Sequence, residues 1–175
     1  YVENGGGLFV IADHTNVYDH AERVNRFLKP MGVEVLYHIA TDVPPVYSVA
    51  GIAWIMSRDM REHPVTRNVD MISLQTGGPV RSESSGVTFT SPCESTPPEG
   101  CSFADLWDPE DPGGYYGNWR WDGDVDEEPV GPLEVVTAHE YGEGRIVVVG
   151  DQNIFGDAWL HFGNNFELFM NAIDW

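Results

Sequence analysis

The sequence predicts an α/β sandwich, in which helices cover both faces of a mainly parallel β-sheet. Two observations lead to this fold class: nearly continuous apolar runs occupy residues 8–13 and 145–151, and amphipathic helical patterns follow both runs. Strands that are buried on both faces lack polar alternation, and such strands are typical of parallel sheets. The 175 residues, 42% of them hydrophobic, suffice for one core, so a single domain over residues 1–175 is expected.

The first strand and helix are predicted from residues 8–31. The strand is LFVIAD, and the three glycines before it suit a tight turn into the sheet. Apolar residues then recur at helical spacing and share one face, whereas charged residues occupy the other face. The apolar set is Val17, Ala21, Val24, Phe27, Leu28 and Met31. The helix should end near Pro30 and Gly32, before a second strand, VEVLYHI.

The middle of the chain has weaker periodicity. Residues 44–64 combine an apolar stretch with mixed charges, so both a helix and irregular packing stay open there. VDMISLQT and VTFTS, bounded by Gly and Pro, predict short strands. Residues 91–132 are rich in Pro, Gly, Asp and aromatic residues, and they predict a long irregular insertion. Long loops of this kind are usually functional or disordered, and the Trp and Tyr side chains argue against complete disorder.

The C-terminal part returns to clear periodicity. LEVVTAHEY, the turn GEG and RIVVVGD predict two more strands, and the second of these ends in Asp151. In the closing segment, Phe166, Phe169, Met170 and Ile173 fall on one face of a predicted helix. That face is expected to pack against the sheet.

The charge composition excludes one class of partner and favours another. The chain has 28 acidic and 9 basic residues, a net charge of −19, which repels nucleic acid and attracts cations. The same composition suits either a protein of high-salt habitats or an acidic extracellular domain that its charge keeps soluble. On the second interpretation, an extracellular or cell-surface location is expected. No run of 18 or more apolar residues is present, and no membrane segment is predicted in this chain.

Cys93 and Cys101 are the two cysteines, eight positions apart in a Pro-rich stretch. They lack the Cys-x-x-Cys spacing and the nearby His partners of a zinc site. A local disulfide is the candidate pairing if the compartment is oxidising, and two free thiols are the alternative.

Asp13 and Asp151 follow the two predicted buried strands. Because parallel strands end at the same edge of a sheet, and ligands bind beyond that edge, the two aspartates are expected to share a crevice. Side chains of the adjoining loops would complete a cluster of carboxylates, amides and imidazoles. These side chains are His14, Asn16, Asp19, His20, Asn153, Asp157 and His161. The ligand-binding candidates are Asp13, His14, Asn16, Asp151 and Asn153; of these, Asp13, His14 and Asp151 are the metal-ligand candidates.

The chemistry of that cluster leaves several interpretations open. Oxygen ligands favour Ca²⁺, Mg²⁺ or Mn²⁺, and added imidazoles shift the preference toward Zn²⁺ or Fe. Capping alone also explains the residue types, because Asn16 at the start of a helix contributes about 1 kcal/mol by accepting amide hydrogen bonds. A Thr15 nucleophile activated by His14 is a third hypothesis, although no Gly-x-Ser-x-Gly turn surrounds it.

The insertion contains an acidic segment, DGDVDEE at residues 122–128. Its Asp122, Asp124 and Asp126 are spaced like the start of a calcium loop, which makes them further metal-ligand candidates. An EF-hand would need Gly and Glu where this chain has Glu127 and Leu133, so that specific motif fails. A looser divalent-cation site and a solvated acidic tip both remain.

Aromatic residues gather just before this acidic segment, in YYGNWRW. Trp119 and Trp121 are the binding candidates, with Tyr115 and Tyr116 beside them. Flat aromatic faces can stack on a glycan, anchor a protein partner or mediate self-association. They can equally fold back and cover the sheet.

Four segments resemble the class I glutamine amidotransferase-like superfamily: YVENGGGLFVIADH, HPVTRNVDMISL, YGEGRIVVVGDQNIFGD and NNFELFMNAIDW. The resemblance covers roughly residues 1–40 and 133–175, and weakly residues 63–75. It implies a flavodoxin-like, three-layer sandwich with further strands upstream of Tyr1. Members of this superfamily place a nucleophilic cysteine at the turn that here reads Asp13, His14, Thr15 and Asn16, and their late His-Glu pair is also unmatched.

These departures predict a catalytically silent domain, serving as a ligand-binding or assembly module of a larger surface or secreted protein. Two alternatives stay open. One is a metal-assisted hydrolase that acts on a small molecule or glycan at the strand ends, with His14 as base or ligand. The other is a structural subunit that self-associates through the aromatic insertion.

Overall fold

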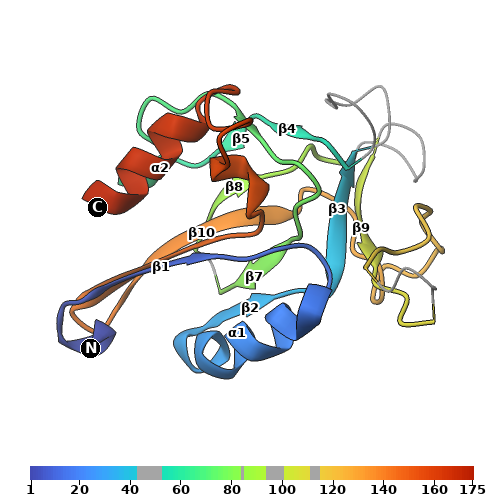
Figure 1. Ribbon diagram of the computed structural model, residues 1–175, viewed down its shortest axis with the longest axis horizontal. Coiled ribbons are helices and arrows are strands. Elements are labelled where there is room, and N and C mark those ends of the chain that lie inside the picture. The colour runs from blue at the N-terminus through green and yellow to red at the C-terminus, as the bar shows by residue number, and fades with distance from the viewer. Residues whose placement is uncertain (43–52, 84, 94–100, 111–114) are drawn as a thin grey trace.

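The computed structural model describes residues 1–42, 53–83, 85–93, 101–110 and 115–175 (Figure 1). Its main sheet has five strands in the order β1-β11-β10-β8-β5. Their bounds are β1 Gly7–Ile11, β5 Asp59–Met60, β8 Gly86–Phe89, β10 Glu134–Tyr141 and β11 Gly144–Val149. The pairing of β1 with β11 is parallel, and the other three pairings in this sheet are antiparallel.

Three two-stranded antiparallel sheets surround the main sheet. β2 Val33–Val35 pairs with β7 Val80–Ser82, and β4 Met56–Ser57 pairs with β6 Ile72–Ser73. β3 His38–Asp42 pairs over its whole length with β9 Ser102–Leu106. In Figure 1 the β3–β9 pair stands at the end of the molecule opposite the two termini.

The described residues contain two α-helices, α1 His20–Leu28 and α2 Asn165–Asp174. Short 3-10 turns complete the helical elements: η1 Val2–Asn4, η2 Val17–Asp19, η3 Lys29–Met31, η4 Pro64–Thr66 and η5 Asn153–Phe155. No helix within the described ranges is long and apolar enough to cross a membrane.

The predicted fold class is therefore wrong in its main feature. The structure is mostly sheet with few helices, and its main sheet is mixed rather than flavodoxin-like and mainly parallel. β10 and β11 form a hairpin closed by Gly142 and Glu143, in which Gly142 has a φ of +63°. A glycine at the first central position with positive φ is typical of such two-residue turns. The apolar runs indicated burial on both faces, which does not determine the direction of the neighbouring strand.

That two-sided burial is visible in the core. Ile146 and Val148 pack in a cluster with Val10 and the buried residues of α1, whereas Val147 and Val149 face a larger cluster that includes Leu168 of α2. Each face of β11 is thus covered by apolar side chains, so the strand reads as an almost continuous apolar run.

Several local predictions are also corrected. The insertion at residues 91–132 is not irregular throughout, because residues 102–106 form β9; residues 94–100 and 111–114 lie outside the described part. Residues 43–52 of the ambiguous middle segment lie outside it as well. The predicted helix over residues 17–31 is interrupted, because Tyr18 and Asp19 have left-handed backbone conformations.

Of the predicted apolar face of α2, Phe169 is half-buried and packs against Phe9 and Phe155, whereas the other three residues are exposed. Phe166, Met170 and Ile173 are 49%, 39% and 57% exposed, whereas Leu168 and Asn165 are fully buried. Asn165 lies inward because its side-chain amide bonds to the backbone of Ser73 in β6.

Candidate functional site

The two apolar strands that end in aspartate lie side by side and run in the same direction, as the sequence predicted. β1 pairs with β11 from Gly7↔Arg145 to Ile11↔Val149, so Asp13 and Asp151 emerge at the same edge. Asp13 is 9% exposed and Asp151 is fully buried. We call Asp13, His14, Thr15 and Asp151 the strand-end floor.

Asp151 binds backbone amides of two neighbouring loops. Its Oδ1 accepts a hydrogen bond from the Asn153 amide at 2.7 Å, and its Oδ2 accepts one from the Gln75 amide. Burial raises the pKa of Asp151 to about 7, the nearby charge of Asp13 adds to the rise, and the amide hydrogen bonds oppose it. Asn153, another predicted ligand, donates from its side chain to the Gln75 carbonyl at 3.0 Å. These contacts join the end of β11 to the loop after β6.

Asp13, His14 and Thr15 form a connected chain of polar contacts. Asp13 Oδ2 accepts from Gln152 Nε2 at 2.7 Å, and Asp13 Oδ1 accepts from the His14 amide at 2.8 Å. The Thr15 hydroxyl donates to the Tyr115 carbonyl at 2.7 Å, so it accepts from His14 Nδ1, which lies 3.1 Å away. Burial lowers the pKa of His14, and the carboxylate of Asp13 works against that shift.

This geometry weighs against the Thr15 nucleophile. The Thr15 side chain has no exposed surface, and its proton is held by the Tyr115 carbonyl rather than by His14. A nucleophilic hydroxyl needs to give its proton to the adjacent base. In this structure the hydrogen bond between Thr15 and His14 runs the other way.

Asn16 and His20 support the joint between β1 and α1. Asn16 Oδ1 accepts a hydrogen bond from the Glu22 amide at 3.1 Å, so Asn16 satisfies a free donor in the first turn of α1 from outside the helix. His20 Nε2 accepts from the Asp13 amide at 3.0 Å, and His20 Nδ1 donates to the Val17 carbonyl at 3.1 Å. Asp157 and His161, by contrast, lie exposed in the loop after η5.

Backbone strain and close packing concentrate around the strand-end floor. Among the described non-glycine residues with positive φ, only Asn68 lies elsewhere; the others are Thr15, Tyr18, Asp19, Thr76 and Trp119. A Cβ added at Gly78 would lie 2.9 Å from the His38 carbonyl oxygen and 3.1 Å from the His14 Cα. Such strain is held only where the surrounding contacts determine the conformation.

No group of three or more His, Cys, Asp or Glu with metal-site geometry occurs among residues that the structure describes. In the acidic loop, Asp122 accepts from the Asn118 side chain and Asp124 Oδ1 accepts from the Asp126 amide at 2.9 Å. The loop closes on Glu128, which is 3% exposed and accepts from the amides of Leu106 and Asp122. The predicted divalent cation stays a prediction.

A surface of four aromatic side chains lies beside the floor, and we call it the aromatic patch. Tyr18 contacts Tyr115 at a centroid distance of 5.3 Å, and Tyr116 contacts Trp119 at 5.3 Å. Tyr116 also stacks on the buried His14 ring at 5.1 Å with an interplanar angle of 9°. The four side chains are 77%, 38%, 38% and 39% exposed in sequence order.

The patch has a rigid base. Asp105 of β9 accepts from the Trp119 amide at 2.9 Å, and any Cβ at Gly117 would overlap the Asp105 carboxylate. Trp121, the second predicted tryptophan, is half-buried and donates from Nε1 to the Glu128 carbonyl at 3.1 Å. Trp121 therefore supports the loop from within. The sequence predictions missed Asp105 and Tyr18, although Tyr18 lies in the joint that they had selected.

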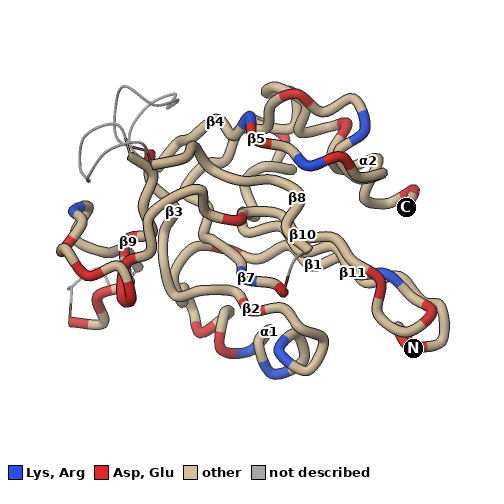
Figure 2. The backbone as a smooth tube through the Cα atoms, turned by 180° about the vertical axis from the view of Figure 1, so that it is seen from behind, with Lys and Arg blue, Asp and Glu red and all other residues tan. Residues whose placement is uncertain are grey.

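Acidic residues surround the aromatic patch. Figure 2 shows acidic segments gathered along the loops beside β9, where few basic residues occur. The exposed acidic side chains are Asp19, Asp108, Glu110, Asp122, Asp124, Asp126 and Glu127. The patch therefore combines apolar area with a negative surround.

Cys93 and Cys101 form a disulfide, with Cα atoms 4.4 Å apart. Cys93 follows β8, and Cys101 directly precedes β9, so the bond links the end of one strand to the start of the next. This is the pairing that the sequence offered as a candidate.

Comparison with known proteins supports the fold and nothing finer. The chain is similar to a solved structure described as the mmIFT52 N-terminal domain, with a TM-score of 0.63 and 14% identity over 100% of this chain and 66% of that chain. At this identity the similarity concerns the fold alone. No family model and no curated protein sequence matches the chain.

The resemblance to class I glutamine amidotransferases is therefore wrong. The structural neighbour belongs to a different family, and the main sheet mixes parallel and antiparallel pairs. The glycine-rich entry and the closing helix had suggested that superfamily. In this structure the glycine-rich segment leads into β1, an edge strand of the mixed main sheet. The closing helix is α2, which packs against Val147 and Val149 of β11.

Proposed function

We propose that this chain is a recognition module that binds a protein partner through the aromatic patch. The observation that carries the proposal is the exposure of two contacting pairs of aromatic side chains on a backbone that buried Asp105 and Thr15 hold in place. Tyrosine and tryptophan are typical anchors of protein interfaces. A pre-ordered backbone loses less conformational entropy on binding than a mobile loop does.

The charges around the patch indicate the chemistry of the partner. The exposed carboxylates of the neighbouring loops, which outnumber the exposed Arg120 beside Trp119, attract a surface that carries Arg or Lys and repel another acidic protein. Because each copy of this chain carries a net charge of −19, self-association through the patch is disfavoured at low salt. The partner should therefore present basic side chains around an apolar or aromatic centre.

The setting we propose is a module of a larger surface or secreted protein. The disulfide and the acidic composition support an oxidising, extracellular location. Thiol trapping followed by mass spectrometry on protein from its native source tests the location: an oxidised pair agrees with it, and two free thiols contradict it.

The binding proposal is tested by selecting partners chemically. Random 12-residue peptides displayed on phage are selected against the folded chain and then titrated by fluorescence anisotropy. We expect enriched peptides with Arg or Lys beside aromatic residues, and an affinity loss of about tenfold or more on Trp119→Ala. The matched control is Tyr1→Ala, because Tyr1 is 89% exposed and lies at the opposite end of the molecule (Figure 1).

Two results would contradict this proposal. One is equal affinity of the selected peptides for the wild type and for a Tyr18→Ala/Trp119→Ala variant that is folded by circular dichroism. The other is failure to select any peptide while a glycan array shows binding that the same double variant loses. The second outcome would assign the patch to carbohydrate recognition.

Metal-assisted hydrolysis at the strand-end floor, the main alternative, gains no support from the described contacts. The carboxylates of Asp13 and Asp151 accept hydrogen bonds from amides, and the Thr15 hydroxyl donates to a carbonyl. All four residues of the floor are buried. The hydrolase therefore stays a prediction without a supporting contact.

A further inference from the structure

Strand β1 forms one edge of the main sheet. Within the described part of the chain, β11 is its one neighbouring strand. The Gly6 carbonyl accepts from the Arg145 amide, and the Ala12 amide donates to the Val149 carbonyl. Because backbone groups alternate sides along a strand, the N–H and C=O groups of Gly7, Phe9 and Ile11 point away from β11. This edge offers a hydrogen-bonding ladder to another strand.

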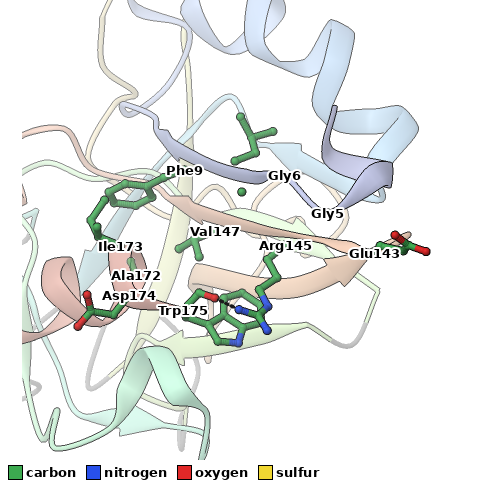
Figure 3. A pocket seen from close by; sticks show the side chains of 12 residues that line it. Gly5, Gly6, Phe9, Glu143, Arg145, Val147, Ala172, Ile173, Asp174 and Trp175 are labelled. Atoms are coloured by element: carbon green, nitrogen blue, oxygen red, sulfur yellow. Dashed lines mark hydrogen bonds between the residues drawn. The ribbon is translucent and has the colours of Figure 1, made fainter.

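A groove runs beside this edge, between β1, β11 and the end of α2 (Figure 3). Its volume is about 500 Å³. Phe9, Val147, Ala172 and Ile173 supply apolar walls, and the backbone of Gly5, Gly6 and Gly7 forms the side next to β1. Ile173 is 57% exposed, so apolar area is open to a side chain that enters from the edge. We call this feature the edge groove.

The charge of the edge groove is negative. Glu143 and Asp174 line it, and Glu3 lies next to Glu143, whose amide donates to the Glu3 carbonyl. Arg145, the one basic residue of the lining, donates to the Trp175 carbonyl and lies over the Trp175 ring, 5.5 Å from its centroid. The dashed line in Figure 3 marks this hydrogen bond, and with Glu143 and Asp174 against Arg145 the lining side chains carry a net charge of −1.

We propose that the edge groove binds an extended segment of a protein partner, which adds to the sheet as a strand beside β1. The segment would exchange backbone hydrogen bonds with Gly7, Phe9 and Ile11, and place an apolar side chain against Ile173. A basic residue of the segment would lie near Glu143 and Asp174. A second copy of this chain is a poorer occupant, because it would bring the same acidic residues to the contact.

The edge groove is distinct from the aromatic patch. Figure 1 places both termini and the start of β1 at one end of the molecule and the β9 loops at the other, whereas the end of β1 at Ile11 leads toward the floor. A chain with two binding surfaces at opposite ends can bridge two partners. The two surfaces do not depend on each other, so they can be tested by separate variants.

Gly7 allows a test that leaves the fold intact. Its N–H points away from β11, so Gly7→Pro removes an outward donor and places the proline ring at the free edge without breaking a bond between β1 and β11. Gly7→Ala is the matched control, because an added Cβ has no neighbouring atom within 4 Å and the donor is kept. Both variants are first compared with the wild type by thermal melting.

The probe is a fluorescein-labelled synthetic peptide, Arg-Val-Thr-Val-Thr-Val, titrated to about 1 mM by anisotropy. We expect binding to the wild type and to Gly7→Ala, and an affinity loss of about tenfold or more on Gly7→Pro. A peptide N-methylated at alternate residues should lose affinity to a similar extent, since its ladder is blocked. Trp119→Ala should leave the affinity unchanged, which separates this result from the proposal about the aromatic patch.

Amide hydrogen exchange gives an independent readout. In the free chain, the amides of Gly7, Phe9 and Ile11 should exchange much faster than those of Leu8 and Val10, and the peptide should slow them. The proposal is overturned if these three amides are already protected without the peptide, if no binding occurs at about 1 mM, or if Gly7→Pro binds as tightly as Gly7→Ala.

Discussion

The strand-end floor and the aromatic patch lie against each other, yet they use their side chains in opposite ways. The floor is polar and buried, and the Asp151, Asp13 and Thr15 side chains all have partners within the protein. The patch is aromatic and 38–77% exposed, and it is held from below by a buried His14 and Asp105. The comparison teaches that clustered polar residues at strand ends can serve the fold, while the surface above them remains available for binding.

Removing the central carboxylate of the floor should have the largest effect on stability. Asp151→Ala leaves the Gln75 and Asn153 amides without their acceptor in a site that water does not reach. We expect a loss of about 4 kcal/mol in the free energy of unfolding, since each unsatisfied buried donor costs 1–3 kcal/mol. Urea denaturation followed by tryptophan fluorescence measures it. Asp157→Ala, at an exposed position, is the control, and an equal loss there would refute the assignment.

The pH dependence of stability tests the base of the patch. Burial raises the pKa of Asp105 from its ordinary value of 3.8 to about 6, and the charge of Glu128 adds to the rise. Between these values the folded chain keeps a proton that the unfolded chain has released, so stability falls as pH rises from about 4 to about 6. Above that window this group has no further effect.

Asp105→Asn should remove that fall, which amounts to at most roughly 3 kcal/mol. Burial lowers the pKa of His14 and His38, and this makes stability rise with pH below about 6.5. Because both proteins share these histidines, the wild type and the variant are compared across the same pH series. Urea midpoints at each pH give the difference. If stability changes with pH in the same way in the wild type and in Asp105→Asn, then Asp105 does not have a raised pKa in the folded chain.

The joint between floor and patch is tested by a smaller change. Thr15→Val removes the hydroxyl that donates to the Tyr115 carbonyl and accepts from His14, while it keeps the side-chain shape. We expect a destabilisation of about 1.5 kcal/mol from the two lost hydrogen bonds. Thermal melting checks the value, with Thr15→Ser as the variant that should retain most of it. If Thr15→Ser loses as much stability as Thr15→Val, the hydrogen bonds of the hydroxyl do not account for the loss.

The patch itself should contribute least to stability. Trp119→Ala keeps the backbone amide that bonds to Asp105 and removes a side chain that is 39% exposed. We expect a stability loss of no more than about 1 kcal/mol, together with the tenfold loss of peptide binding. A stability loss as large as that of Asp151→Ala would show that the ring is part of the core.

Sequence patterns predicted the strands of this fold better than its topology. The apolar runs at residues 8–13 and 145–151 gave two adjacent parallel strands and placed Asp13 beside Asp151. The hairpin partner β10 was found as a strand, but its antiparallel direction depends on the two-residue turn at Gly142, which apolar periodicity does not report. Strand direction is decided by connections and not by burial.

The site was located from sequence but its chemistry was not. Asp13 and Asp151 lie near each other at the ends of β1 and β11, as predicted. The hydrogen bonds of Asp13, Asn153 and Asn16 are made to Gln152, Gln75 and Glu22, and residue type alone cannot distinguish such bonds from ligation. Trp119 and Trp121 are neighbours in the sequence pattern, yet one is exposed and the other supports its own loop. Asp105, which accepts from the Trp119 amide, lies in β9, and Glu128, whose carbonyl accepts from Trp121, is tied to β9 through the Leu106 amide.

The separate roles of floor and patch can be measured in one titration series: the affinity of the selected basic peptide for folded Trp119→Ala and for folded Asp151→Asn, side by side. The separation of structural floor from binding patch predicts a loss of about tenfold or more for the first variant. It predicts an affinity within about twofold of the wild type for the second, whatever stability that protein loses. A tenfold loss for Asp151→Asn with unchanged binding by Trp119→Ala would place the binding site in the floor and contradict the account.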